Sequence, residues 1–108
     1  MKKPVVIKIG GAILDGYNQG NTFALTALLS VIASLKDQPV VIVHGGGCVV
    51  DEMLAQAGFT TEKKHGLRVT PKAQMPIISG ALAGSVNKAI VATAASLKLA
   101  AVGLSLTD

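Results

Sequence analysis

The chain has 108 residues, the size of one ordinary domain, and is 50% hydrophobic, 15% charged and only 3% aromatic. Soluble domains carry about 25% charged residues, so this composition excludes a disordered chain and predicts one that buries most of its surface. The net charge of +4 comes from dispersed lysines and a single arginine. This pattern excludes a basic, aromatic surface for nucleic acid and indicates either plain solubility or a bias toward anionic small ligands.

Cysteine usage and hydropathy indicate the compartment. The single cysteine, Cys48, excludes a disulfide framework and a cysteine-based zinc site, and it fits a reducing environment. The first apolar run ends at Ile7 and is too short for a signal peptide. The longest apolar stretch, residues 89–106, is interrupted by polar residues and makes a poor membrane span. We therefore expect a cytoplasmic protein without a membrane segment.

The first elements are a strand and a helix. The β-branched run Val5–Ile9, closed by Gly10–Gly11, predicts a buried strand and a tight turn. Residues 15–21 are rich in glycine and asparagine and predict a loop. From Thr22 an amphipathic helix is expected, with leucine and isoleucine on one face and hydroxyl residues on the other, and Pro39 ends it.

The same order of elements then repeats. A second buried strand, Val40–Val43, leads directly into His44 and the triplet Gly45–Gly47. Apolar residues recur at helical spacing over residues 50–57, with acids in the first turns where the helix dipole favours them, and Gly58 is a natural helix stop. These features predict a second strand–turn–helix unit.

The rest of the chain predicts a hairpin, a long helix and a strand. Residues 60–69, centred on His65–Gly66, predict a short β-hairpin. A helix that is apolar on most sides follows over about residues 70–97, and Pro76 is expected to kink it or to delay its regular start. Ala100–Leu106 predicts a third buried strand.

The order of these elements predicts the fold class. Strands that are apolar throughout and alternate with helices indicate a parallel sheet covered on both faces. We therefore expect a three-layer α/β/α fold with a mainly parallel sheet and a short β-hairpin. The sequence stops on a core-type strand without a closing turn or helix, so this fold is expected to be incomplete.

The strongest local signal is a strand, then Gly45–Gly47, then a helix. Glycines let backbone N–H groups face a ligand and the helix N-terminus adds positive charge, so this strand end predicts a phosphate or carboxylate site, unless the glycines serve only a tight turn. The triplet is not a dinucleotide fingerprint, because Val50 stands where the last glycine is required. Gly11 and Gly16 have P-loop spacing, but Tyr17 follows them in place of lysine.

Two cations accompany this signal. Lys8 lies in the first strand just before Gly10–Gly11, where it would either neutralise phosphate oxygens during transfer or extend to solvent at the sheet edge. Arg68 is the only arginine, and a guanidinium is the natural bidentate clamp for a carboxylate. The sequence alone favours a solvated strand charge at this position.

The remaining polar residues predict structural roles. His44 and His65 have no triad or metal ligands around them in the sequence, so we expect turn or hydrogen-bonding roles. Cys48 is expected as a small core residue because no partner base is evident. Asn87 and Lys88 are expected on an exposed helix face.

Gly80 and Gly84 lie one turn apart on the last helix. This spacing permits the close approach of another backbone, which would belong either to this chain or to a second subunit. We expect no bound metal ion, because the sequence contains no ligand constellation.

Four segments together resemble the amino-acid kinase family, and the resemblance covers essentially the whole chain. They are Val6–Gly11, Val41–Met53, Lys64–Thr70 and Gly80–Lys88. The Lys-x-Gly-Gly pattern of the first segment and the glycine triplet of the second recur widely in that family. The last two segments resemble the branch that phosphorylates N-acetyl-L-glutamate.

The resemblance implies a reaction and its substrates. ATP, accompanied by Mg²⁺, would transfer its γ-phosphoryl group to the side-chain carboxylate of N-acetyl-L-glutamate, a step of arginine biosynthesis. The resemblance also implies a homodimer and no nucleic-acid or membrane partner.

The resemblance assigns roles residue by residue. Lys8 would stabilise the transition state, and Gly46 and Gly47 would offer N–H donors to the substrate. Arg68 would hold the α-carboxylate of the substrate, with the backbone of Leu67 lining the same pocket.

Three further glycines, Gly10, Gly11 and Gly45, would bind phosphate. Members of this family are more than twice as long as the present chain and carry most of the nucleotide site in their second half. We therefore expect residues 1–108 to be the acetylglutamate-binding portion without the nucleotide-binding portion, and to have little or no kinase activity alone. The alternatives are a non-catalytic acetylglutamate- or anion-binding module and a relative acting on carbamate, aspartate or a nucleotide.

Overall fold

The structure is a computed structural model that describes residues 2–14 and 22–108. The loop expected at residues 15–21 lies outside the described residues. The elements, in chain order, are β1 (Val5–Ile9), α1 (Gly11–Leu14), α2 (Phe23–Ala33), β2 (Val40–His44), α3 (Gly47–Gln56), β3 (Glu62–Lys64), β4 (Leu67–Val69), the 3₁₀ turn η2 (Lys72–Gln74), α4 (Met75–Ser79), the π-helical segment η3 (Gly80–Val86) and α5 (Asn87–Ser96).

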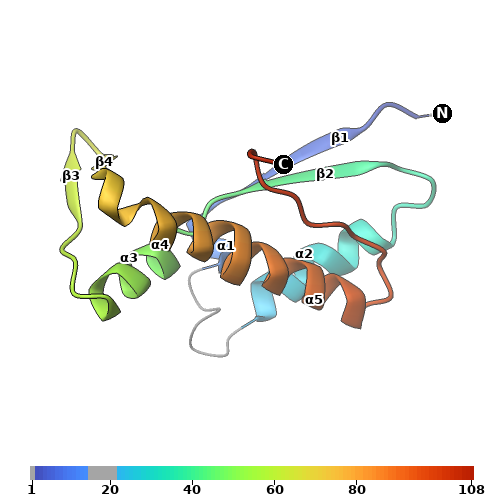
Figure 1. The fold of residues 1–108 in the computed structure, drawn as a ribbon. Coiled ribbons are helices and arrows are strands. Elements are labelled where there is room, and N and C mark those ends of the chain that lie inside the picture. The colour runs from blue at the N-terminus through green and yellow to red at the C-terminus, as the bar shows by residue number, and fades with distance from the viewer. Residues whose placement is uncertain (1, 15–21) are drawn as a thin grey trace.

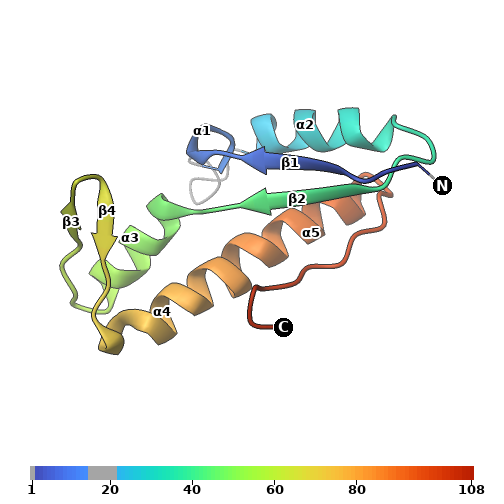
Figure 2. The same ribbon diagram turned by 90° about the horizontal axis from the view of Figure 1, so that it is seen from above.

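The two long strands form a parallel pair, as the sequence predicts. Strand β1 pairs with β2 in a register that places Val5 opposite Val40 and Ile9 opposite His44. The carboxyl ends of both strands therefore lie at the same edge of the sheet, and Figures 1 and 2 show both arrows pointing to the end where α1 and α3 begin. This parallel sheet, together with the separate hairpin of β3 and β4, confirms the α/β class.

Helices cover one face of this sheet. Ile7, Ile9 and Ile42 point inward and are buried or half-buried, whereas Val41 and Val43 point outward and are exposed. In Figure 1 both α2 and α5 lie below the strands, and Figure 2 shows α2 beside β1 and α5 beside β2. The described residues thus supply one of the two helical layers that the apolar strands predict, and the alternation of burial follows from this one-sided cover.

The core is aliphatic. Ile9, Leu25, Leu29 and Leu54 are its largest fully buried side chains. Ile9 comes from β1 and Leu54 from α3. The two leucines of α2 lie one helical turn apart, on the face that the spacing of apolar residues predicts. The hydrophobic effect on these residues therefore joins β1, α2 and α3 into one unit.

The last helical run, residues 72–96, is long and apolar enough to span a membrane by length and composition. It also packs on α2 and α3, and five of its side chains belong to the core: Ile78, Ala81, Val86, Ile90 and Ala94. One face of this run therefore belongs to the core that it shares with α2 and α3.

This run changes its helical type three times, from 3₁₀ to α, from α to π and from π back to α. Pro71 is extended and precedes η2. Pro76 is the second residue of α4, where the missing N–H removes no hydrogen bond of the regular helix. The expected delay before the regular helix is therefore confirmed. The π-helical segment η3 was not predicted, because its wider turn leaves no distinct spacing in a sequence of small and aliphatic residues.

The expected turns are present. His65 and Gly66 have φ values of 53° and 77°, which suits a two-residue hairpin turn that needs positive φ at both positions. Gly58 ends α3 with φ of 86°, and the N–H of Phe59 donates to the carbonyl of Leu54 in the six-to-one bond of a Schellman motif. Short-range turn chemistry was therefore predictable from the sequence.

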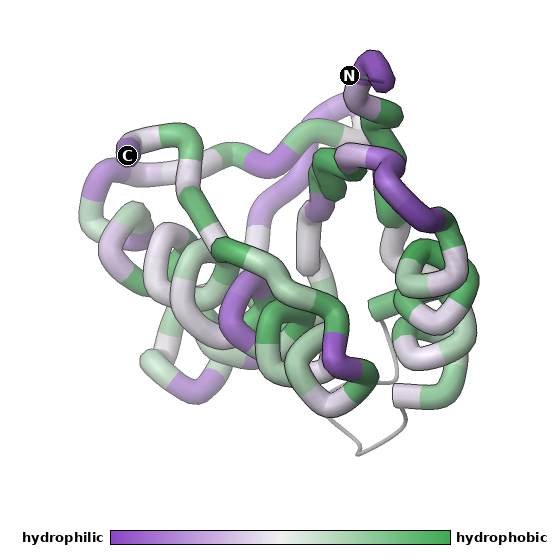
Figure 3. Tube along the Cα trace, turned by 90° about the vertical axis from the view of Figure 1, so that its right-hand side faces the viewer, coloured by the Kyte–Doolittle hydropathy of each residue, from purple (hydrophilic) through white to green (hydrophobic). Residues whose placement is uncertain are grey.

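The expected third strand at Ala100–Leu106 is wrong, because these residues have no strand conformation. After α5 the chain runs back along that helix in the direction of β1 and β2 (Figures 1 and 2). The carbonyl of Gly103 accepts a hydrogen bond from the side chain of Lys88, and that of Leu104 accepts one from Asn87. In a strand these carbonyls would instead accept from the backbone N–H groups of a neighbouring strand. Val102, Leu104 and Leu106 remain exposed. Figure 3 shows that much of this C-terminal segment is hydrophobic.

The one-sided burial of α2 gives a direct test of the core. Leu29→Ala removes a side chain that is 0% exposed, and Val31→Ala removes one that is 61% exposed on the same helix. We expect Leu29→Ala to lower the free energy of unfolding by about 2–5 kcal/mol and Val31→Ala to change it by less than about 0.5 kcal/mol. Urea unfolding followed by circular dichroism measures both, and equal losses would contradict this packing.

Candidate functional site

The carboxyl edge of the sheet collects the glycine turns. Gly10 follows β1 and leads into α1, while Gly45 and Gly46 follow β2 and lead into α3. Because β1 and β2 are parallel neighbours, these two turns lie side by side where open α/β sheets bind ligands. The register therefore brings together the glycines that the sequence placed more than thirty positions apart.

Within the described residues, nothing requires glycine at Gly10, Gly45 or Gly47. A Cβ added to any of the three would meet no heavy atom of residues 2–14 and 22–108 within 4 Å, and none of the three has a positive φ. A tight turn or a packing contact would have required one or the other. The absence of side chains here instead leaves the backbone open to close approach from outside the chain.

Gly46 differs from its neighbours. Its φ is 148°, and an added Cβ would lie 2.7 Å from Cγ2 of Val86 and 3.3 Å from Cδ2 of Leu82. This glycine is required by backbone conformation and by contact with η3. It also precedes α3 as its N-cap and accepts the first helical hydrogen bond, from the N–H of Val50 at 3.0 Å.

The N-terminus of α3 supplies the electrostatics of this edge. The helix has 10 residues, and its N-cap residue, Gly46, has no side chain that could cap the first N–H groups. A helix start of this kind presents N–H donors and about half a positive charge. Joined to the open glycines, it makes an arrangement that fits a phosphate or carboxylate group.

Lys8 lies on the outer face of the sheet, next to the edge with the glycine turns. It pairs with Val43 in the register, one residue before the last pair of the ladder, and its side chain is exposed. This position agrees with both interpretations of the sequence, because the residue is exposed and lies two positions before Gly10 in the chain.

Arg68 is held by an acid of α3. Its Nη2 lies 2.6 Å from Oδ1 of Asp51, and its Nη1 donates to Oγ1 of Thr61 at 3.4 Å. Thr61 in turn donates to Asp51 at 3.2 Å, and Nζ of Lys63 lies 3.8 Å from the second oxygen of the same carboxylate. The Arg68 side chain is 18% exposed, so the solvated strand charge that the sequence favoured is wrong.

This ion pair brings the hairpin to the first turns of α3. Asp51 follows Gly47 by four residues, so the two lie on the same side of the helix and about 6 Å apart along its axis. Arg68 is thereby anchored roughly one helical turn from the glycine edge. Leu67, its neighbour in β4, has a 73% exposed side chain.

The charges around Asp51 set its acidity. Partial burial acts to raise the pKa of this carboxyl, but the hydrogen bond and the charge of Arg68, followed by Lys63 and Thr61, outweigh it and hold the pKa below its ordinary value. Asp51 is therefore ionised at neutral pH and balances one of the cations of the hairpin.

Two sequence expectations about polar residues at this end of the molecule are wrong. Asn87 is buried at 8% exposure, whereas it was expected on an exposed face, because its amide bonds to His44 and to the carbonyl of Leu104. Cys48 is exposed, whereas it was expected in the core, because α3 begins at Gly47 and turns its second residue outward. The hydrogen-bonding role of His44 and the exposed position of Lys88 are confirmed.

Gly80 and Gly84 stay open in the described structure. Both are exposed, and an added Cβ would meet no heavy atom within 4 Å at either one. Of the two expectations for this pair, close packing within the chain is therefore absent from the described residues, and a second subunit stays a prediction.

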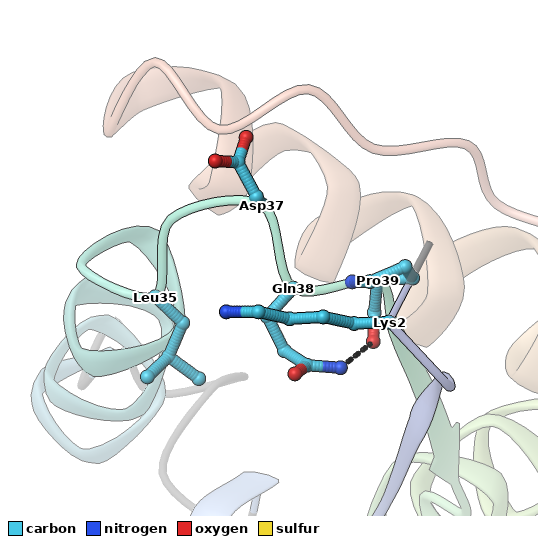
Figure 4. Close-up of a pocket in the computed structure, with 5 residues that line it drawn as sticks. All are labelled: Lys2, Leu35, Asp37, Gln38 and Pro39. Atoms are coloured by element: carbon cyan, nitrogen blue, oxygen red, sulfur yellow. Dashed lines mark hydrogen bonds between the residues drawn. The ribbon is translucent and has the colours of Figure 1, made fainter.

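A concave surface of about 700 Å³ lies at the opposite end of the sheet, where the chain enters β2 (Figure 4). Lys2, Leu35, Asp37, Gln38 and Pro39 line it, and the amide of Gln38 donates to the carbonyl of Pro39 at 3.0 Å. Parallel α/β sheets bind ligands at the carboxyl ends of their strands, so this hollow is on the wrong edge for the chemistry of the glycine turns.

Among residues 2–14 and 22–108, no group of three or more histidine, cysteine, aspartate or glutamate side chains could hold a metal ion.

Comparison with known proteins identifies the family of the chain. The sequence profile of the amino acid kinase family matches residues 3–108. The chain therefore belongs to the amino acid kinase family. It is 74% identical over 106 residues to the acetylglutamate kinase of Colwellia psychrerythraea, and this alignment covers 98% of the chain but 39% of the relative.

Two further comparisons give the same picture. The acetylglutamate kinase of Aeromonas hydrophila is 48% identical over 110 residues, with 99% of the chain and 40% of the relative covered. The crystal structure of smu.665 from Streptococcus mutans UA159 matches with a TM-score of 0.77 and 32% identity over 97% of the chain and 41% of that protein. The chain thus spans about two fifths of the length of the relatives it matches.

The glycines of the triplet should respond differently to substitution. Gly46→Ala combines a positive φ with a 2.7 Å approach to Val86, so we expect it to lower the free energy of unfolding by about 2 kcal/mol. Gly45→Ala meets open space and should change stability by less than about 0.5 kcal/mol. Chemical denaturation decides the matter, and equal losses from the two variants would refute the distinction.

The pair of Asp51 and Arg68 predicts a pH dependence of stability. The folded pKa of Asp51 is lower than its unfolded value of about 4, so the stabilisation is present above pH 4 and is lost as pH falls through the folded pKa. Because the carboxylate is 38% exposed, we expect Asp51→Asn to cost about 1 kcal/mol at pH 7. The difference from wild type should shrink toward zero as the pH falls below the folded pKa of Asp51, and a pH-independent difference would show that the charge is not the cause.

Proposed function

We propose that the protein containing this chain is an acetylglutamate kinase. It would transfer the γ-phosphoryl group of ATP to the side-chain carboxylate of N-acetyl-L-glutamate: a carboxylate oxygen forms a bond to phosphorus, the bond to the bridging oxygen breaks, and ADP leaves. The observation that supports this best is the pair of open glycine turns at one sheet edge. At Gly10, Gly45 and Gly47 neither a positive φ nor a contact with a described residue requires glycine.

The phosphate side of the site would consist of backbone donors and a lysine. We assign Gly10, Gly11 and Gly45 to the phosphoryl group and Lys8 to the charge that develops on it in the transition state. Phosphoryl transfer needs mainly positioning and charge neutralisation, and these groups can supply both. Lys8 is exposed and one ladder position from the end of β1, so its flexible side chain can reach the edge.

The acceptor side would consist of Gly46, Gly47, Arg68 and the backbone of Leu67. A guanidinium has five N–H donors, and Asp51 and Thr61 use part of this set. The rest can form a charge-assisted bond to the α-carboxylate of acetylglutamate. In this proposal Asp51 fixes the direction of the guanidinium, which lowers the entropy lost when the substrate binds.

The other substrates and partners belong to the same proposal. ATP with Mg²⁺ would be the co-substrate, the enzyme would work in the cytoplasm as a homodimer, and most nucleotide contacts would come from sequence outside these 108 residues. The relatives are about two and a half times as long as the aligned part. We expect residues 1–108 alone to bind acetylglutamate and to show little or no turnover.

Two alternatives follow from the same residues. A non-catalytic module would bind acetylglutamate or another small anion at the open glycines without phosphoryl transfer. A different member of the family would act on carbamate, aspartate or a nucleotide. A panel of these acceptors with ATP, assayed on the intact gene product, separates the three readings, since each predicts a different acceptor or none.

Calorimetry with N-acetyl-L-glutamate, without nucleotide, tests the acceptor site. We expect Arg68→Ala in the intact gene product to weaken binding by about 10- to 100-fold, because a charge-assisted bond of about 1.5–3 kcal/mol is lost. Lys63→Ala is the matched control, since Lys63 also contacts Asp51 but is exposed, and it should change affinity by less than about twofold. Unchanged binding by Arg68→Ala would contradict the assignment.

A further inference from the structure

Behind the glycine edge lies a chain of hydrogen bonds that connects β2, the last helix and the C-terminal segment. His44, the last residue of β2, contacts the carbonyl of Gly45 through Nδ1 at 2.9 Å and the amide of Asn87 through Nε2 at 3.1 Å. Asn87 is the first residue of α5 and is 8% exposed. A buried polar side chain in an otherwise apolar helix stretch needs its hydrogen bonds satisfied, and this one has them.

The orientation of the Asn87 amide follows from its other two partners. Nζ of Lys88 can only donate, and it lies 2.9 Å from Oδ1 of Asn87. The carbonyl of Leu104 can only accept, and it lies 3.1 Å from Nδ2. The oxygen and the nitrogen of the amide are therefore assigned without reference to the histidine, and Nδ2 is the atom that faces the imidazole.

This orientation fixes the tautomer of His44. Nδ2 of Asn87 donates, so Nε2 of the ring must accept and carries no proton. The proton of the neutral ring is then on Nδ1, where it is donated to the carbonyl of Gly45. Each donor in the chain meets an acceptor, which leaves one consistent arrangement.

The tautomer has a consequence for the glycine loop. In a trans peptide the carbonyl and the N–H point in opposite directions, and the described residues contain no cis bond. Holding the Gly45 carbonyl against the ring therefore turns the N–H of Gly46 away from His44. Val86, the residue before Asn87, leaves room only for glycine at position 46, because an added Cβ there would lie 2.7 Å from its Cγ2.

We propose that His44 and Asn87 are positioning residues for the substrate-binding loop, with Asn87 holding His44 in the Nδ1–H tautomer so that the Gly46 N–H is aimed at the acceptor carboxylate. This inference rests on the proposed acetylglutamate site. Neither residue touches the substrate. Their effect is to pre-form a donor that would otherwise have to be ordered when the ligand binds.

The tautomer can be measured directly in the wild-type protein. Long-range proton–nitrogen correlation NMR on the intact gene product, with ¹⁵N-histidine and with the His44 signal identified by its loss in His44→Gln, reports which ring nitrogen is protonated. We expect Nδ1–H with an unprotonated Nε2. A protonated Nε2, or rapid averaging of the two nitrogens, overturns the proposal whether or not Asn87→Ala folds.

Two variants then test the coupling to the substrate. Asn87→Ala removes the donor to Nε2, so His44 should lose its single tautomer, the Gly46 amide resonance should shift, and acetylglutamate affinity should fall by about tenfold. Lys88→Met removes the bonds to Asn87 and Gly103 but keeps Asn87 opposite His44. The tautomer of His44 should therefore stay the same, and the affinity for acetylglutamate should change by less than about twofold. Loss of affinity in Asn87→Ala with an unchanged tautomer would indicate a merely structural role and overturn the proposal.

The outcomes for the site and for the positioning pair are separable. If the wild-type protein binds no acetylglutamate, the proposed function fails. The His44 tautomer and the shift of the Gly46 amide signal in Asn87→Ala then still decide whether His44 and Asn87 position the loop. If acetylglutamate binds and Arg68→Ala abolishes binding while His44 shows the Nε2–H tautomer, the function stands and the positioning proposal falls.

Discussion

The parallel pairing of β1 with β2 is the constraint on which the site depends. Its register sets Ile9 opposite His44, and this places the turn after β1 beside the turn after β2. A shift of one residue would turn Ile7 and Ile9 from the core to the outer face, so the hydrophobic effect that fixes the core also fixes the alignment of the two glycine turns. Fold and site therefore share one cause.

A second interaction extends this edge. The ion pair of Arg68 with Asp51 at 2.6 Å attaches the hairpin, which is otherwise short and exposed, to the first turns of α3. A two-stranded hairpin of three-residue strands is marginal on its own. Its arginine keeps a defined position near the glycine edge because an ionised carboxylate on a core helix holds it there.

Much of the fold could be predicted because its signals are local. Helical periodicity placed α2 with Leu25 and Leu29 inward, β-branched runs placed both parallel strands, and positive-φ turn chemistry placed the hairpin at His65–Gly66. Of the candidate site, the glycine turns and the position of Lys8 beside them were also predictable, since strand ends and glycines are visible in the sequence.

The failures concern partners that lie far apart in the sequence. Residues 100–106 have the composition of a strand, but composition does not supply a neighbouring backbone, and helix side chains take their carbonyls instead. Asn87 resembled a solvated helix residue because its partner His44 is 43 positions away. The same limit hid the pairing of Arg68 with Asp51, and no spacing rule revealed the π-helical segment η3.

The central claim is that the glycine edge at the carboxyl ends of β1 and β2 binds the carboxylate substrate. The most direct test is a titration of the intact gene product, labelled with ¹⁵N-glycine, with N-acetyl-L-glutamate. The account predicts that the amide signals of Gly10, Gly11 and Gly45–Gly47 shift together and saturate, while that of Gly58, at the far end of α3, stays in place. Saturable binding without any shift at these glycines would contradict it.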